Sequence, residues 1–313
     1  MKLHIELTTQ YDNTIGCFMI QFPNISPEIF SITFQGFEFS LRWYAVSYIA
    51  GFIAAIYVMR FFLKRDYLWR YRTAPMEVEQ IDSFITYLIL GVIIGGRVGY
   101  VLFYNLPFFL DNPVSIVRIW EGGMSFHGGF LGVVIAVYCF CKFNGIPVLS
   151  GSDLVAIASP PGLMFGRIAN FINAELWGKP TDFAFGVVFP GVRAQDCPDI
   201  IGPCARHATQ LYEAGLEGLI LFGALVVLAF LGFFKKPGFI MGVFFFGYGI
   251  CRFFVEIVRE ADPQFVTLEN PAGYVVWFGN IGLSMGQVLS IPMIILGFLI
   301  LLLAFTKRGR VNV

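Results

Sequence analysis

The chain has 313 residues, of which 57% are hydrophobic and only 13% are charged, whereas a soluble domain carries about 25% charged residues. Its 21 basic and 21 acidic residues cancel and no basic face accumulates, so nothing in the composition indicates a nucleic-acid partner. The N-terminus does not read as a signal peptide, because no apolar segment appears before residue 40. We therefore expect the targeting information in membrane helices.

Apolar stretches of about 20 residues, long enough to cross ~30 Å of hydrocarbon, recur along the chain. Their length and continuous apolar character predict helices rather than the alternating strands of a membrane barrel. We predict an all-α integral membrane protein whose seven transmembrane helices lie at about Trp43–Leu63, Phe84–Tyr104, Phe126–Phe143, Leu154–Ile172, Leu216–Phe234, Gly238–Val258 and Met285–Phe305. In the second helix, Gly91, Gly95 and Gly99 form a small-residue stripe that predicts close packing against another helix.

Loop charges predict the orientation of these helices. Basic residues gather after the first helix, after the fifth helix and in the tail, at Lys64, Arg65, Arg70, Arg72, Lys235, Lys236, Lys307, Arg308 and Arg310. The positive-inside rule then places the N-terminus outside and the C-terminus in the cytoplasm. The expected regions are an interfacial segment of short amphipathic pieces (1–40), a membrane domain (41–305) with outside segments 173–215 and 259–284, and a cytoplasmic tail (306–313).

Three arginines, Arg97, Arg167 and Arg252, fall inside predicted apolar spans. Each costs several kcal/mol in lipid unless it is paired or hydrated, so each is a candidate functional residue, with a structural ion pair as the alternative. At 1.5 Å per residue, all three are expected ~20 Å from the cytoplasmic helix ends, in the outer half of the bilayer. Three cations at one depth indicate a site for an anion such as a phospholipid phosphate, which planar guanidinium groups bind well.

Polar residues share helix faces with two of these arginines. The faces hold Tyr248, Arg252 and Glu256 at spacings of four, and Arg167, Asn170 and Asn173 at spacings of three. Tyr44 and Tyr48 form a similar pair on the first helix, for which an interfacial aromatic belt is the alternative.

Two histidines stand at predicted helix ends. His127 precedes two glycines, which let the backbone approach a ligand closely, and an ordinary histidine pKa of about 6.5 suits proton transfer at neutral pH. His207 precedes one helical face formed by Gln210, Glu213 and Glu217, which a surface salt-bridge cluster explains equally well.

The six cysteines match no zinc-binding pattern, so no metal site is predicted. Cys139, Cys141 and Cys251 are expected to act as small hydrophobic residues in or near helices. Cys17, Cys197 and Cys204 are expected outside, and the last two flank a short loop stiffened by Pro198 and Pro203. A disulfide between Cys197 and Cys204 is therefore predicted, with two free thiols as the alternative, and Cys17 is left unpaired.

The segment Gly166-Arg167-Ile168-Ala169-Asn170-Phe171-Ile172-Asn173-Ala174-Glu175-Leu176-Trp177-Gly178 resembles the signature of the prolipoprotein diacylglyceryl transferase family. The resemblance covers nearly the whole chain. Its other motifs include Arg42-Trp43-Tyr44, Gly95-Gly96-Arg97-Val98-Gly99-Tyr100, Gly122-Gly123-Met124-Ser125-Phe126-His127-Gly128-Gly129, Gln210-Leu211-Tyr212-Glu213 and Ser284-Met285-Gly286-Gln287. Ala169 stands where the family pattern has Gly, and the insert at 267–283 has no counterpart in that pattern.

The resemblance implies a seven-helix enzyme of the bacterial cytoplasmic membrane whose active site faces the outer leaflet. A cysteine thiol in the lipobox of an exported precursor would attack the glycerol carbon of phosphatidylglycerol, forming a thioether and releasing glycerol-1-phosphate, with no cofactor. It further implies that Arg167 and Arg252 hold the phosphate and that His127 is the candidate base, with a tyrosine or an arginine-stabilised thiolate as the alternative. Residues implied to position the substrates or tune the arginines are Tyr44, Arg97, Asn170, Asn173, Glu175, Gly178, Tyr248 and Glu256, with Gly178 making a tight turn after the fourth helix.

Two other functions stay open on the residues alone. A membrane phospholipase or headgroup transferase would use the same phosphate site, with water or another alcohol as the nucleophile. An anion transporter or channel would carry polar residues through the full bilayer depth, whereas here they stop near the outer half, which favours the transferase.

Overall fold

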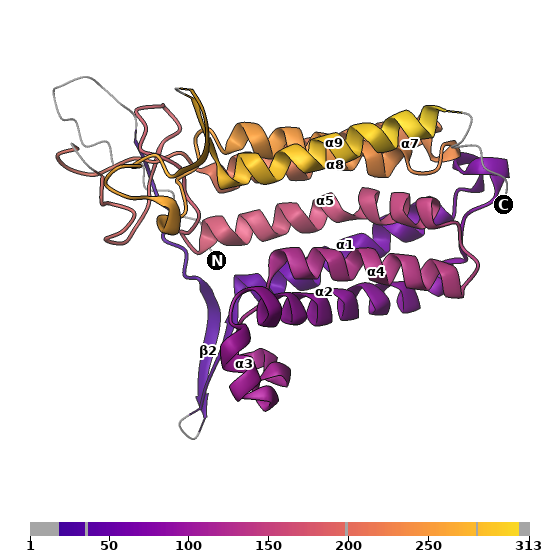
Figure 1. Ribbon diagram of the computed structural model, residues 1–313, viewed down its shortest axis with the longest axis horizontal. Coiled ribbons are helices and arrows are strands. Elements are labelled where there is room, and N and C mark those ends of the chain that lie inside the picture. The colour runs from indigo at the N-terminus through magenta and orange to yellow at the C-terminus, as the bar shows by residue number, and fades with distance from the viewer. Residues whose placement is uncertain (1–18, 35–36, 198–199, 280, 307–313) are drawn as a thin grey trace. The chain divides into compact units, whose positions relative to one another are not determined.

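The computed structural model describes residues 19–34, 37–197, 200–279 and 281–306, and this part of the chain is mostly helical (Figure 1). Cys17, half of the predicted interfacial segment and the basic tail residues lie outside the described residues.

Six helices in the described part are long and apolar enough to cross a membrane. They are α1 (Trp43–Leu63), α2 (Ile81–Phe103), α4 (Phe126–Phe143), α5 (Val148–Ile172), α9 (Met285–Phe305) and a composite helix, Thr209–Phe230. The composite helix joins α6 (Thr209–Glu213), a π-helix (Ala214–Ile220) and α7 (Leu221–Phe230). An all-α membrane protein is consistent with this architecture, and the predicted ranges of α1, α4 and α9 are confirmed.

Four predicted spans differ from the structure at their ends. Helix α2 runs from Ile81 to Phe103 rather than from Phe84 to Tyr104. Helix α5 begins at Val148 rather than Leu154, and the composite helix begins at Thr209 rather than Leu216. The predicted span left out Gln210 and Glu213, which are buried inside the composite helix. The span predicted at Gly238–Val258 is helix α8 (Phe239–Val255), a shorter apolar helix of 17 residues.

Strands form in segments where no strand was predicted. A hairpin of β2 (Glu28–Phe34) and β3 (Phe37–Arg42) leads directly into α1, and β5 (Tyr274–Phe278) pairs with β6 (Ile281–Ser284) before α9. The short strands β1 (Ile20–Gln21) and β4 (Val187–Val188) pair in parallel. The remaining helical pieces are α3 (Leu106–Asp111) and single turns of 3-10 helix, including Pro113–Val117 and Ile119–Glu121.

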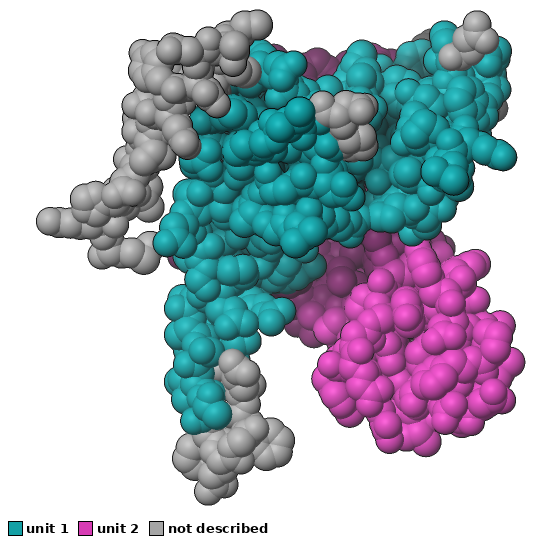
Figure 2. Space-filling view, turned by 90° about the vertical axis from the view of Figure 1, so that its left-hand side faces the viewer, with its two compact units in different colours: residues 1–51, 159–225, 243–299 teal, residues 52–158, 226–242, 300–313 magenta. Residues whose placement is uncertain are grey.

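The chain divides into two compact units, which Figure 2 shows in different colours. The first unit comprises residues 1–51, 159–225 and 243–299, and the second comprises 52–158, 226–242 and 300–313. In the second unit, α2 packs directly against α4, and a Cβ built on Gly95 would lie only 2.8 Å from the Cα of Gly132. The predicted packing role of the glycine stripe is therefore confirmed.

A buried carboxylate ties α5 to α8 in the second unit. Asp153 is fully buried and accepts hydrogen bonds from the backbone nitrogens of Gly238 at 2.7 Å and Met241 at 2.8 Å. These donors lie at the first turn of α8, where free N–H groups and the helix dipole favour a negative charge. The ordered start of α8 therefore depends on this side chain of α5.

Candidate functional site

Glu213 is the centre of a buried ion-pair cluster in the first unit. Its side chain is fully buried, and Oε2 lies 3.1 Å from Nε of Arg167. Its other oxygen pairs with Arg252 and lies 3.3 Å from Nη1 of Arg259. One carboxylate thus holds guanidinium groups from α5, from α8 and from the segment that follows α8.

Arg252 bridges two carboxylates. Besides Glu213, it pairs with Glu256 one turn further along the chain, as the spacing of four residues predicted. Glu256 is fixed in turn by Ser284, whose hydroxyl donates to Oε2 at 2.9 Å. Gly286 leaves room for this carboxylate, because a Cβ there would collide with it. The guanidinium orientation of Arg252 is therefore set from two sides.

The face formed by Gln210, Glu213 and Glu217 is fully buried, so the alternative of a surface salt-bridge cluster is wrong. Glu213 and Glu217 were not among the predicted site residues. The rule that identified the arginines could also have found these two residues. An unpaired carboxylate at the start of an apolar span is as costly as an unpaired cation.

A second hydrogen-bonded group adjoins the end of α5. Asn170 donates through Nδ2 to the hydroxyl of Tyr44 and to Oε1 of Glu175, the latter at 2.7 Å. Gln210 donates to the backbone carbonyl of Glu175. Burial raises the pKa of the Glu175 carboxyl, which lies beyond the end of α5. Three of the predicted positioning residues, Tyr44, Asn170 and Glu175, are thus brought together.

Two other predicted residues have structural contacts instead. Asn173 donates to the carbonyl of Ala169 at 2.8 Å, one turn back on its own helix. The turn after α5 is made by Ala174 and Leu176, whose φ angles are 50° and 59°. Gly178 has no positive φ. A Cβ on it would lie 2.7 Å from Cβ of His207, so this glycine serves close packing rather than the predicted tight turn.

Tyr248 is buried on α8, stacks on Phe244 and interacts electrostatically with Arg167 and Glu217. The cluster therefore joins a phenol, three guanidinium groups and three carboxylates, at Tyr248, Arg167, Arg252, Arg259, Glu213, Glu217 and Glu256. The side chains of Arg167 and Arg252 are 19% and 17% exposed, so an approaching anion can reach them while their charges stay balanced from behind.

His127 and Arg97 belong to the second unit. His127 is exposed in the first turn of α4, next to the capping residue Ser125, whose Oγ accepts from the Gly128 nitrogen at 3.2 Å. The recorded ring contact of His127 is with its neighbour Phe126, and no ion pair to it is found among the described residues. The structure thus gives the predicted base an exposed position without an orienting carboxylate.

Arg97 is buried, and all five of its N–H donors are occupied by backbone carbonyls. Nε donates to Ile116 at 2.8 Å, Nη2 to Ser115 and Arg118, and Nη1 to Gly122 and Gly123. Five is the full donor capacity of a guanidinium group. Arg97 therefore fastens the segment 115–123, which leads to His127, and has no donor left for a phosphate.

We expect Arg97→Lys to destabilise the protein, because an ammonium group has three donors for five buried carbonyls. Hydrogen bonds to charged groups contribute ~1.5–3 kcal/mol each, so losing two predicts a loss of ~3–6 kcal/mol and a clearly lower Tm. Thermal unfolding in detergent measures this, with Arg118→Lys, in an exposed pair, as the matched control. An unchanged Tm combined with a raised KM for phospholipid would contradict the anchoring role and restore Arg97 as a phosphate ligand.

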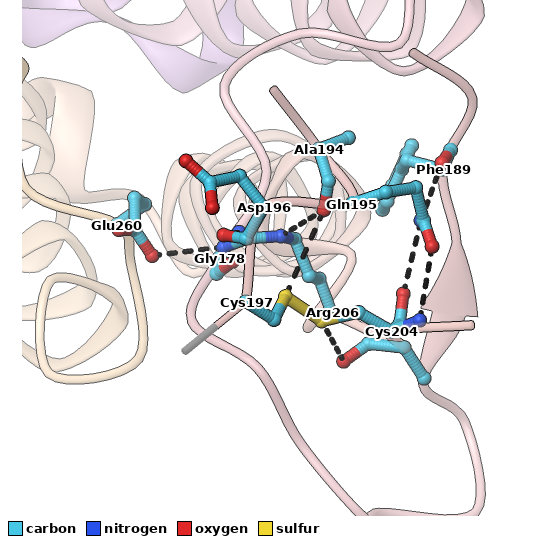
Figure 3. The surroundings of a disulfide bond; sticks show 10 residues. Gly178, Phe189, Ala194, Gln195, Asp196, Cys197, Cys204, Arg206 and Glu260 are labelled. Carbon is cyan, nitrogen blue, oxygen red and sulfur yellow. Dashed lines mark hydrogen bonds and ion pairs between the residues drawn. A yellow bond between two sulfur atoms is a disulfide. The ribbon is translucent and has the colours of Figure 1, made fainter. Parts of the chain in front are cut away.

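The segment between α5 and the composite helix is held by a disulfide and by Arg206 (Figure 3). Cys197 and Cys204 are bonded, with their Cα atoms 6.3 Å apart. Buried Arg206 donates to the carbonyl of Ala194 at 2.6 Å and to that of Asp196 at 3.0 Å, and pairs with Glu260 at 3.0 Å. Arg206 thereby links the disulfide loop to the segment after α8.

The disulfide should be structural rather than catalytic, since it touches none of the clustered charges described above. We expect the double variant Cys197→Ser, Cys204→Ser to keep most of its turnover, while losing roughly 2–3 kcal/mol of stability in the chain-entropy model. Mass mapping of unreduced protein checks the bridge, and activity assays check its dispensability. Free thiols at both positions in protein prepared without reductant would disprove the pairing.

Comparisons with known proteins bear on this site. The family model described as prolipoprotein diacylglyceryl transferase matches residues 31–303. A phosphatidylglycerol–prolipoprotein diacylglyceryl transferase of Cereibacter sphaeroides (strain ATCC 17025) is 53% identical over 91% of this chain and 98% of its own length. Similarly named proteins of Ruegeria pomeroyi and Bradyrhizobium diazoefficiens are 51% and 46% identical, each over 93% of this chain and over 98% and 95% of their own lengths.

Proposed function

Because this chain belongs to the prolipoprotein diacylglyceryl transferase family, we propose that it transfers the diacylglyceryl group of phosphatidylglycerol to the lipobox cysteine of prolipoproteins. The thiol sulfur forms a thioether with the glycerol carbon, the bond from that carbon to the phosphate oxygen breaks, and glycerol-1-phosphate leaves. The observation that carries this proposal is the partly exposed pair Arg167 and Arg252, both held by the buried carboxylate of Glu213.

The chemistry makes two demands on the protein. The leaving phosphate gains negative charge as the bond breaks, and guanidinium groups fixed in advance stabilise that charge without reorganising. Arg167 and Arg252 supply this charge, while Glu213 and Glu256 orient them. Tyr44, Asn170 and Glu175 position the lipid beside these two arginines. The phenol of Tyr248 adds a further polar group to the site. The thiol must also lose its proton, which requires a base.

The proposed topology has seven spans, with α8 as the sixth and the active site in the outer leaflet of the bacterial cytoplasmic membrane. The asymmetry of loop charges supports it, because Lys64, Arg65, Arg70 and Arg72 follow α1 on the side assigned to the cytoplasm. The outside segments are then 173–215 and 259–284, and the tail 306–313 is cytoplasmic.

We expect a reporter fused after Val313 to be cytoplasmic and one inserted near Thr181 to be outside. Thr181 suits an insertion because it lies outside the helices and strands, in the segment proposed to be outside. Activity of alkaline phosphatase and fluorescence of green fluorescent protein, used as paired reporters, measure the two locations. An outside C-terminus would overturn both the orientation and the outer-leaflet site.

The test of the function is direct. Purified protein is incubated with phosphatidylglycerol and a lipobox peptide, and the thioether product is measured by mass spectrometry. A peptide with serine in place of the cysteine is the control. Thioether and glycerol-1-phosphate in equal amounts support the transferase. Release of glycerol phosphate without thioether would identify a phospholipase, and phosphatidylglycerol left intact would refute both enzymes.

A further inference from the structure

Glu217 is a buried carboxylate that the functions described so far leave unexplained. It is fully buried in the π-helix Ala214–Ile220, and the one side chain among the described residues that hydrogen-bonds to it, Tyr248, cannot saturate its two oxygens. Its recorded ion pair, to Nη2 of Arg167, measures 3.7 Å, whereas the pair between Arg167 and Glu213 measures 3.1 Å. Buried charged groups are normally paired and fully hydrogen-bonded, so this carboxylate has open acceptor capacity inside the site.

The groups that face Glu217 come from three helices. Arg167 approaches from α5, Glu213 from the same composite helix, and Tyr248, Cys251 and Arg252 from α8. Among the described residues, no other charged or titratable side chain is found in an ion pair or electrostatic contact with Glu217. Its location in a π-helix is also notable, because such segments occur frequently at functional sites.

We propose that Glu217 is the general base of the reaction, an inference that rests on the proposed transferase function. The Glu217 carboxylate takes the thiol proton as the S–H bond breaks. The sulfur then bonds to the glycerol carbon, and the electron pair of the broken C–O bond leaves on the phosphate oxygen beside Arg167. The proton passes from Glu217 to the departing glycerol phosphate or to water, which restores the carboxylate and balances the step.

Phosphate binding makes this assignment stronger. A lipid phosphate that engages Arg167 competes for the one guanidinium group recorded in an ion pair with Glu217. Two anions close together in a buried site disfavour double ionisation, so lipid binding favours proton uptake by the carboxylate. Glu217 therefore gains its proton affinity when both substrates are in place. His127, exposed and without an orienting carboxylate, has no comparable coupling.

The test compares Glu217→Gln with the wild type in single-turnover thioether formation between pH 6.5 and 9.5. General-base catalysis is worth 10²–10⁴-fold, so we expect a loss of roughly 100-fold at pH 7. The deficit should shrink above pH ~9, because thiols with a pKa of about 8.5 then ionise without a base. The KM for phosphatidylglycerol should change little. The exposed Glu269→Gln is the matched control and should behave as wild type.

A selenocysteine peptide separates a base from a structural residue, because its selenol is already ionised at neutral pH. Glu217→Gln should transfer to this peptide at close to the wild-type rate, whereas His127→Asn should show the same deficit on both peptides. If Glu217→Gln fails to fold, Glu217→Asp replaces it, with a deficit expected on the cysteine peptide alone. An equal deficit on both peptides, or no deficit, overturns the assignment. Wild-type protein that forms no thioether would overturn the proposed function instead.

Discussion

Replacing Glu213 with glutamine should reduce diacylglyceryl transfer by at least roughly 100-fold. Glu213 is the shared partner of Arg167, Arg252 and Arg259, so the variant would leave three guanidinium groups with one carboxylate fewer between them. Removing one partner from a buried ion pair costs about 3–5 kcal/mol. About 2.7 kcal/mol of that, lost from transition-state stabilisation, already corresponds to a factor of 100 in rate.

The measurement is the initial rate of thioether formation, accompanied by thermal unfolding. Glu121→Gln is the matched control, because Glu121 pairs with Arg118 in an exposed ion pair that contributes at most ~1 kcal/mol. The control should keep its rate and its Tm. A Glu213→Gln variant with near-normal transfer would show that the arginines are held in place without their common carboxylate, and the site would have to be sought elsewhere.

The length of the apolar runs predicted the membrane helices. A span in lipid must satisfy its backbone hydrogen bonds internally, so it is a helix with a continuous apolar sequence. The exposed apolar side chains of α9, such as Leu302 and Leu303, fit that reasoning. The same criterion placed the start of the composite helix too late. Polar residues that are neutralised by partners on other helices do not end a helix, and a single span carries no information about those partners.

The strands escaped prediction for a different reason. The hairpins β2–β3 and β5–β6 are short, and each forms a two-stranded sheet with no further strand. Such pairs draw their stability from the surroundings rather than from a strong alternating pattern of their own. No Asn-Gly or Asp-Gly pair, the strongest short hairpin signal, stands between the segments that form β2 and β3.

Within the candidate site, helical spacing predicted the residues that share a face but not the partners of each. The grouping of Tyr248, Arg252 and Glu256 followed from their spacing of four. Helical spacing could not distinguish an arginine that faces the site from one that anchors a neighbouring backbone segment. Arg252 meets carboxylates and remains partly exposed, whereas the N–H groups of Arg97 donate to backbone carbonyls of a segment about 20 residues further along the chain. That segment has no periodic pattern from which its carbonyl directions could be inferred.

Arg252→Lys should lower turnover by at least roughly tenfold, which corresponds to a loss of about 1.4 kcal/mol of transition-state stabilisation. The two terminal nitrogens of Arg252 reach two different carboxylates, Glu213 on the composite helix and Glu256 directly after the end of α8. A lysine ammonium is a point charge on a flexible stem, so it cannot hold both carboxylates and present a planar face to phosphate.

Arg118→Lys provides the matched control for this charge-conserving change, since the ion pair of Arg118 with Glu121 is exposed. Rates of thioether formation at saturating phosphatidylglycerol give kcat, and rates at limiting lipid give kcat/KM. Because the lost interactions orient the phosphate in the transition state, we expect both to fall together in Arg252→Lys. Turnover within twofold of the wild type would mean that positive charge alone suffices at this position, and the two-carboxylate support of the guanidinium group would then serve folding rather than catalysis.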